Sequence, residues 1–387
     1  MEGFITQASN FVWSPALVAL CLLGGLWFSV RGRFLQLRLI DEMIRLLFQK
    51  KVGEVGISSF QALTMTLAGR VGTGNIAGVA TAICFGGPGA LFWMWVVAFL
   101  GASSAFVEST LGQVFKVNID GEYRGGPAYY LHHLFIRKGS RRKRSVIASL
   151  FALSGLICWF GISQVTANSI SSSFENAFHI PPLYSTIALV AVAAVIVLRK
   201  NTTVKVLDII VPIMAACYFF ITVFIIIRNA PALPAVFERI FAEAFDLRQA
   251  VAGGLGAVIM NGAKRGLFSN EAGSGSAPCA AAAADISHPA KEGLLQALGV
   301  FIDTIVICTC SAMIMLLMPQ SMGAGLEGMD LLQTAMRYHL GEFGVIFIAV
   351  ILWLFSFSTF LGILFYARSN VAYLFGDSWA AQTIYKI

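Results

Sequence analysis

Nine long apolar stretches, separated by short polar loops, decide what this chain can fold into. A run of about 20 apolar residues is long enough to cross a bilayer as a helix. Of the 387 residues, 57% are hydrophobic and 12% are charged, whereas a soluble domain has about 25% charged residues. The sequence therefore predicts an all-α polytopic membrane protein. The nine predicted spans are Phe11–Val30, Ser58–Ile83, Ala90–Phe115, Val146–Ser169, Tyr184–Leu198, Val206–Ile227, Val251–Ala284, Leu294–Met318 and Gly344–Tyr366.

The distribution of basic residues predicts the orientation. The loops after the first, third and fifth spans are basic, whereas the loops after the second and fourth contain no Lys or Arg. Basic loops stay in the cytoplasm, so we expect the N-terminus outside and the chain in the plasma (inner) membrane, and an interfacial helix behind the first span. The net charge of +7 then reflects topology and not nucleic-acid binding. The basic residues concerned are Arg31, Arg33, Arg38, Arg45, Lys50, Lys51, Arg137, Lys138, Arg141, Arg142, Lys143, Arg144, Arg199, Lys200 and Lys205.

A polar, glycine-rich stretch, Gly69–Gly78, interrupts the second span, and Asn261–Pro278 interrupts the seventh. Irregular backbone at membrane depth must be buried in protein or line a wet cavity. The second stretch also carries charges, each costing about 2.5–3.5 kcal/mol at the bilayer centre, and Glu271 with Arg265 is the expected local pair. The two breaks lie an odd number of spans apart and cross in opposite directions, which points to a secondary transporter site. The alternative is that the glycines only permit tight helix packing.

Six motifs stand out around the breaks and along the other spans: Gly72–Ala80, Gly86–Trp95, Tyr123–Tyr130, Arg265–Gly273, Gly299–Thr304 and Phe357–Thr359. Together they resemble the alanine/glycine:cation symporter family, the sodium:alanine symporters. The resemblance implies sodium-driven uptake of alanine or glycine through a LeuT-type fold, in which one peripheral helix precedes two inverted five-helix repeats.

On this basis the chain divides into four parts. Residues 1–54 form a peripheral helix and an interfacial helix, 55–228 the first repeat, 229–376 the second repeat, and 377–387 an aberrant tail. The family continues through two further spans, so the second repeat is expected to be incomplete, with three helices. The alternative function is then a truncated, non-transporting remnant, or half of a split transporter whose missing helices a separate peptide supplies.

The resemblance also implies a substrate site at the first break. The amide of Asn75 would donate to a substrate carboxylate, with Phe268 as a hydrophobic lid; an interhelical hydrogen bond and a core aromatic are the alternatives. Thr166 stands where the family has Gln, and Ile363 where it has Trp, which puts alanine as the substrate in doubt. The other expected pocket residues are Thr73, Gly74, Gly78, Gln164 and Thr359.

A sodium site is implied beside it. Sodium is a hard cation that needs oxygen ligands, and the analogy supplies the carbonyls of Ala68, Val71 and Phe355 with the hydroxyls of Ser358 and Thr359. The alternative is that these hydroxyls bond back to the preceding turn, and a proton could replace sodium. No cofactor besides this coupling ion is expected, and the expected partners are a small neutral amino acid, sodium and lipid.

For the remaining ionisable and reactive residues, the sequence favours a structural role over a catalytic or metal-binding one. For the intramembrane carboxylates Glu108, Glu271 and Asp303 we expect structural pairing rather than ion coupling. The five histidines lie in loops or at span ends and form no helix-borne metal motif, and no nucleophile has a nearby base, so an enzyme is disfavoured. The seven cysteines are interpreted as small core residues.

Overall fold

The computed structural model describes residues 3, 12–49, 56–119, 121–136, 144–197, 202–245 and 254–386. These residues are helical except for loops and one antiparallel hairpin, β1 (Val117–Ile119) with β2 (Glu122–Arg124). The predicted all-α membrane class is confirmed. Part of the orientation argument rests on basic residues outside the described ranges, namely Lys50, Lys51, Arg137, Lys138, Arg141, Arg142, Lys143, Arg199 and Lys200.

Each predicted span has a helical counterpart, and five of the helices are long and apolar enough to cross a membrane by themselves. The counterparts are α2 (Pro15–Arg31), α5 with η1 and α6 (Ser59–Arg70, Gly74–Gly78, Val79–Gly86), α7 (Gly89–Val114), α9 (Val146–Phe178), α10 (Pro182–Val197), α11 (Thr202–Arg228), α14 with α15 (Gly254–Asn270, Ala277–Ala281), α16 with η3 and α17 (Pro289–Val300, Phe301–Cys308, Thr309–Leu316), and α20 (Glu342–Phe375).

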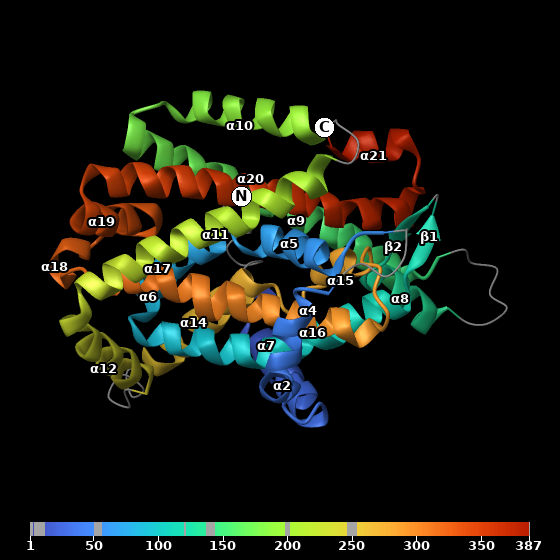
Figure 1. The fold of residues 1–387 in the computed structure, drawn as a ribbon, viewed down its shortest axis with the longest axis horizontal. Helices are drawn as coiled ribbons and strands as arrows, with labels where there is room; N and C mark the ends of the chain where they lie inside the picture. The colour runs from blue at the N-terminus through green and yellow to red at the C-terminus, as the bar shows by residue number, and fades with distance from the viewer. Residues whose placement is uncertain are drawn as a thin grey trace.

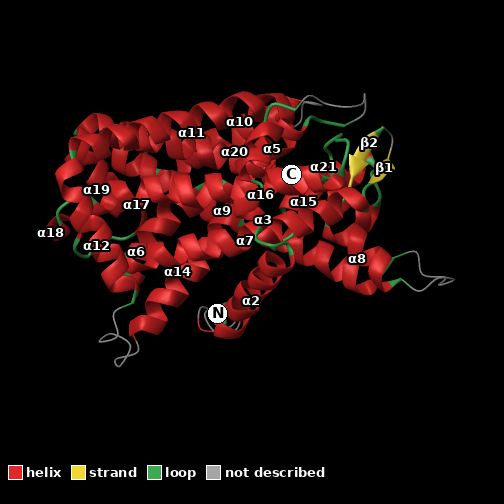
Figure 2. Cartoon of the chain, turned by 60° about the horizontal axis from the view of Figure 1, so that its bottom comes forward, coloured by secondary structure: helices red, strands yellow, loops and turns green. Residues whose placement is uncertain are grey.

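Shorter helices lie between and beside the spans. Behind α2, α3 (Leu35–Arg38) and α4 (Ile40–Leu46) occupy the segment predicted as interfacial. The hairpin and α8 (Pro127–Phe135) lie at one end of the molecule, whereas α12 (Leu233–Ala244), α18 (Gln320–Gly323) and α19 (Gly328–Leu340) lie at the opposite end (Figures 1 and 2). The remaining short helices are η2 (Ala230–Ala232) and α21 (Trp379–Lys386).

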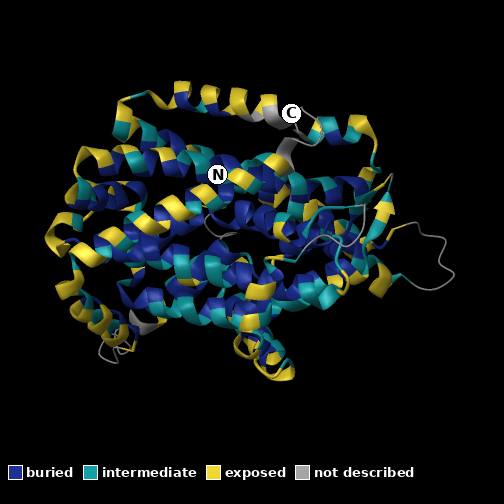
Figure 3. Ribbon diagram, viewed as in Figure 1, coloured by how far each residue is buried: buried dark blue, intermediate teal, exposed yellow. Residues whose placement is uncertain are grey.

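The core forms around α7 and α20. Helix α7 packs against α2, α14, α15 and α16, and α20 packs against α5, α9 and α19. Buried residues follow these inner helices, whereas exposed ones follow the outer faces of α2, α10 and α11 (Figure 3). Because many exposed side chains on these faces are Leu, Ile and Phe, the outer surface suits contact with lipid.

The tail expected to be aberrant is attached to this core. Asp377 accepts a hydrogen bond from Arg124 Nη2 at 3.0 Å, and Gln382 Nε2 donates to the carbonyl of Arg368 at 3.1 Å. Arg124 is buried and also pairs with Glu122 at 2.6 Å. An ion pair thus connects the tail to the hairpin.

Both predicted breaks are present, and they differ in backbone. Helix α5 starts with a capping box between Ser58 and Gln61 and ends at Arg70; Val71 is extended, and the chain resumes as the π-helix η1. Helix α14 ends at Asn270, and Glu271, Gly273 and Gly275 follow with positive φ. A further irregularity, the π-helix η3, was not predicted. Such π segments are frequent at functional sites.

Candidate functional site

The two breaks meet at a buried polar cluster centred on Asn75. Its Oδ1 accepts from the Gly72 N–H at 2.9 Å, and its Nδ2 donates to Asp303 Oδ1 at 2.7 Å and to the Asp303 carbonyl at 3.1 Å. Asp303 Oδ2 accepts from Ser269 Oγ at 2.9 Å and from Thr304 Oγ1 at 2.9 Å. Asn75, Asp303 and Thr304 have no exposed surface. One carboxylate on η3 therefore connects both broken helices.

A second carboxylate holds the backbone of the second break. Glu108 on α7 accepts from Gly273 N–H and Gly275 N–H, each at 3.1 Å. Glu271 accepts from Ser276 Oγ at 2.5 Å. The predicted pair of Glu271 with Arg265 is wrong, since the ion pairs among the described residues do not join them. The reason is that Glu271 adopts a left-handed φ of 52° at the turn, which takes its side chain out of the helical register that the prediction assumed.

Arg70, at the end of α5, is a member of this site that the sequence reasoning missed. It is 2% exposed, and its Nη1 donates to the Gln296 carbonyl at 3.2 Å. A Cβ atom added at Gly299 would lie 2.8 Å from Nη1, so this glycine makes room for the guanidinium. Among the described residues its Nε and Nη2 have no hydrogen-bond partner. Its charge acts on Glu108, Glu271 and Asp303; a lone arginine inside an apolar span was the available signal.

Two of the residues implied for sodium, Ser358 and Thr359, bond to a third, Phe355, and Thr359 also contacts the first break. Ser358 Oγ and Thr359 Oγ1 both donate to the Phe355 carbonyl, at 2.7 and 2.9 Å. The back-bonding that was the alternative interpretation is therefore present. Thr359 also lies against the break, since a Cβ atom added at Gly72 would be 2.5 Å from its Oγ1. Ala68 and Val71, at the end of α5 and just after it, are also buried.

The residues implied for the substrate fall into two groups. Gly74 touches the second break, because an added Cβ atom would lie 3.2 Å from Ser269 Cα and 3.4 Å from Phe268 Cδ1. Thr73 and Gly78 lie on the same segment, η1 and its N-cap. Gln164 and Ile363 instead line an apolar cavity of about 1130 Å³ between α9, α10, α20 and α21. Thr166 is fully buried on α9, and its Oγ1 has no hydrogen-bond partner among the described residues.

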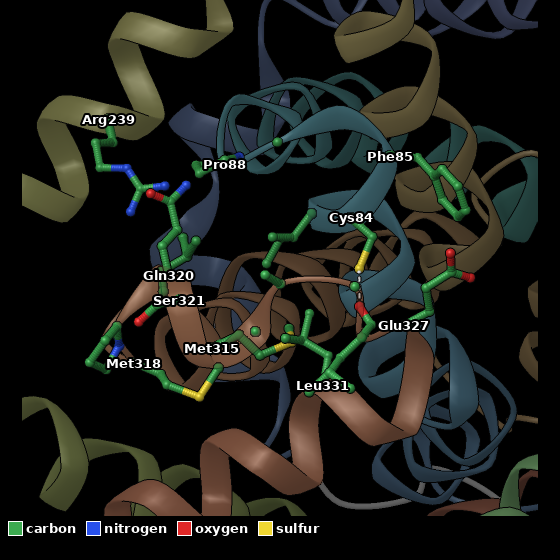
Figure 4. Close-up of a pocket in the computed structure, with 18 of the residues that line it drawn as sticks. Cys84, Phe85, Pro88, Arg239, Met315, Met318, Gln320, Ser321, Glu327 and Leu331 are labelled. Carbon is green, nitrogen blue, oxygen red and sulfur yellow. Dashed lines mark hydrogen bonds between the residues drawn. The ribbon is translucent and has the colours of Figure 1, made fainter.

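A further cavity, of about 660 Å³, opens at the α12–α18–α19 end of the molecule. Arg239 and Gln320 lie on one side of it, and Cys84, Phe85 and Glu327 on the other (Figure 4). Cys84 and Phe85 belong to α6, the continuation of the first broken helix. The cavity therefore lies beyond one end of the Asn75 cluster.

The fold and the site define a multi-pass helical membrane protein of the transporter class. The chain belongs to the sodium:alanine symporter family, which matches residues 1–387. This membership confirms the resemblance seen in the motifs, and the family consists of transporters rather than enzymes. Because the match covers residues 1–387, it does not support the expected truncation or a separate peptide that supplies missing helices.

The names of three relatives describe sodium-coupled carriers. The chain is 44% identical to the putative sodium/proton-dependent alanine carrier protein YrbD of Bacillus subtilis, over 97% of this chain and 79% of that protein. It is 42% identical to the probable sodium/glutamine symporter GlnT of the same organism, over 97% and 78%. It is 36% identical to the sodium/alanine symporter AgcS of Methanococcus maripaludis, over 97% and 84%.

Among solved structures, a manganese transporter of Eremococcus coleocola shares the fold. The TM-score is 0.57 at 12% identity, and the match covers 87% of this chain and 71% of that one. This likeness concerns the fold alone and carries no information about the cargo.

Proposed function

We propose that this protein is a sodium-coupled symporter that imports small neutral amino acids such as alanine or glycine. The observation that carries the proposal is the Asn75–Asp303–Ser269 cluster, which joins both broken helices at one buried point. Helix breaks that meet at membrane depth are typical of substrate and ion sites in transporters with inverted repeats. The proposal includes the LeuT-type arrangement, with repeats at 55–228 and 229–376.

In this proposal the substrate binds at η1. Thr73, Gly74 and Gly78 form the floor, Phe268 covers the substrate side chain, and Thr166 and Thr359 complete the set. Gln164 and Ile363, which were also expected here, line the separate apolar cavity and are left out of this proposal. The contact of Gly74 with Phe268 leaves little room above the floor, which favours a small substrate. Because Asn75 Nδ2 donates to Asp303, its donation to a substrate carboxylate requires the exchange of one existing bond.

Sodium is proposed to bind between the first break and α20, through Ala68, Val71, Phe355, Ser358 and Thr359. The hydroxyls of Ser358 and Thr359 both donate their hydrogen bond to the Phe355 carbonyl. A hydroxyl has one proton and two lone pairs, so its oxygen still has lone pairs for a cation. The Phe355 carbonyl accepts two hydrogen bonds and is the weakest of the five proposed ligands.

The proposed orientation places the N-terminus outside and the hairpin end in the cytoplasm of a cell with this protein in its plasma membrane. The basic loops after the first, third and fifth spans support it. Arg337 lies in the loop after the eighth span, which this orientation puts outside, but its charge is paired with Glu342 at 2.9 Å.

The test is uptake of radiolabelled alanine into proteoliposomes with an inward sodium gradient. We expect uptake that requires the gradient. In an Asn75→Ala variant we expect uptake at least about tenfold lower, because the three buried hydrogen bonds of Asn75 with Gly72 and Asp303 disappear. Uptake that is equal with and without the gradient would exclude sodium coupling. Competition by glycine and glutamine measures the substrate range, since a relative carries a glutamine symporter name.

A further inference from the structure

The cytoplasmic ends of the two broken helices are connected by backbone hydrogen bonds. Ile57 lies just before α5, and its N–H donates to the Ala283 carbonyl at 3.0 Å; the Asp285 N–H donates to the Ile57 carbonyl at 2.9 Å. Ile57 and Ala284 thereby form an isolated parallel β-bridge. A parallel bridge between segments more than 200 residues apart in sequence connects the elements that a transporter must separate to open this end. We call Ile57 and residues 283–285 the inner latch.

Two side chains from the end of α7 close this latch. Lys116 Nζ donates to the Ala284 carbonyl at 2.7 Å and to Gln113 Oε1 at 2.9 Å. Gln113 Nε2 donates to the same Ala284 carbonyl at 2.9 Å and also to the Ala281 carbonyl. Ala281 is the last residue of α15, and its carbonyl also accepts from the Ala284 N–H at 3.1 Å. The lysine thus holds the end of the second broken helix in place.

The surroundings of Lys116 leave it little freedom. Its ammonium lies 4.0 Å from the centroid of the Tyr123 ring on β2. A Cβ atom added at Gly56 would lie 2.6 Å from the Ala283 carbonyl oxygen and 2.9 Å from Tyr123 Cδ2, so the chain before α5 fits tightly against both. Burial lowers the pKa of Lys116, and the charges of Asp285 and Glu292 oppose that shift. The ammonium is therefore partly desolvated.

The opposite end of the molecule has a different character. There the cavity of about 660 Å³ opens beside α6 and α17, whereas the hairpin end has the latch (Figures 1 and 4). The first broken helix thus begins next to the inner latch and ends, at α6, beside this cavity.

We propose that Lys116 is a positioning residue that keeps the inner latch closed, and that substrate leaves toward the cytoplasm only when its ammonium releases the Ala284 carbonyl. The inference rests on the transport function proposed above. Removing the ammonium then shifts the protein toward an arrangement open to the cytoplasm, which lowers apparent affinity for external substrate.

Cys279 provides a readout that does not depend on transport. It lies on α15 and is 1% exposed, so a membrane-impermeant maleimide reaches it from the cytoplasmic side only when the latch opens. Inside-out vesicles are labelled, and modification of each cysteine is quantified by peptide mass spectrometry. We expect Lys116→Met to raise the rate at Cys279 about tenfold, and Lys116→Arg, which keeps a charged donor, to restore most of the protection.

Two controls separate latch opening from unfolding. Lys291→Met removes another lysine at this end, whose ammonium bonds Ser287 Oγ at 3.0 Å, and is expected to leave the rate at Cys279 unchanged. Cys310, buried on α17, is expected to stay unmodified in every folded variant. An unchanged rate at Cys279 in Lys116→Met would overturn the proposal, even if sodium-driven alanine uptake is confirmed; conversely, a raised rate would support the latch in a protein that fails to take up alanine.

A cross-link gives a second, independent test. Backbone segments paired as in a sheet lie about 4.8 Å apart, within the Cα separation that a disulfide allows. Ile57→Cys with Ala284→Cys is therefore expected to lock the latch on oxidation. Alanine uptake then falls at least about tenfold and returns when the disulfide is reduced. Full uptake by the oxidised double variant would exclude the latch as a moving part.

Discussion

In both helix breaks, backbone N–H groups that have left the helix donate to a side chain, but the accepting side chains differ in charge. In the first break the Gly72 N–H is satisfied by the neutral amide of Asn75; in the second, Gly273 and Gly275 donate to the carboxylate of Glu108. No residue of the first break has a positive φ, whereas three in the second do. The first break is thus a short irregular segment within a helix, whereas the second is a turn whose backbone amides require a charged acceptor.

The charges are distributed in a complementary way. The first break has a buried cation, Arg70. It acts on two carboxylates, that of Glu271 in the second break and that of Glu108 on α7, which binds this break. Since isolated charges at membrane depth are costly, each break supplies part of what the other needs. The comparison teaches that the two halves of the site are electrostatically interdependent.

The largest expected effect follows from removing the cation. Arg70→Met removes the buried positive charge that acts on the carboxylates around both breaks. Removing one partner of a buried ion pair costs about 3–5 kcal/mol, which is an upper limit here because Arg70 forms no direct ion pair among the described residues. We expect a fall of up to this size in the free energy of unfolding, measured by denaturant titration in detergent. Arg70→Lys keeps the charge and should lose less. If Arg70→Met is as stable as the parent, the interdependence of the breaks is wrong.

A smaller effect is expected at the second break. In Glu108→Gln one of the two amides, that of Gly273 or Gly275, loses its acceptor, because a glutamine side chain has one carbonyl oxygen where the carboxylate has two. An unsatisfied buried amide costs about 1–3 kcal/mol, read from the same titration. Glu42→Gln, at a partly exposed position of α4 where the carboxylate pairs with the exposed Arg45, is the matched control. A loss no larger than in the control would show that the second break does not depend on a charged partner.

The smallest effect is expected where the breaks touch. Gly74→Ala adds a methyl group 3.2 Å from Ser269 Cα and 3.4 Å from Phe268 Cδ1. One methyl group in a fitted pocket is worth about 1–3 kcal/mol of discrimination, so uptake of alanine relative to glycine should fall about tenfold. Competition assays in proteoliposomes measure this ratio. An unchanged ratio would place the substrate away from this contact.

Much of the architecture could be predicted because its causes are local. Apolar length defines each span, and glycine-rich polar stretches mark both breaks within the correct spans. The motifs around these breaks also identified the family. The expected site residues were recovered only in part: Thr359 and Gly74 lie at the first break, whereas Gln164 and Ile363 line the apolar cavity beside α9.

What the sequence by itself determined, then, is membership of the membrane class, the nine helical segments and the positions of the two interruptions. Hydropathy and backbone preference act over a few residues, so a single chain shows them directly. The tertiary structure alone decided the partners: Asn75 with Asp303, 228 residues away, Glu108 with the amides of the second break, and Ser276 in place of Arg265 for Glu271. Such pairings depend on which helix faces pack together, and that information is not local.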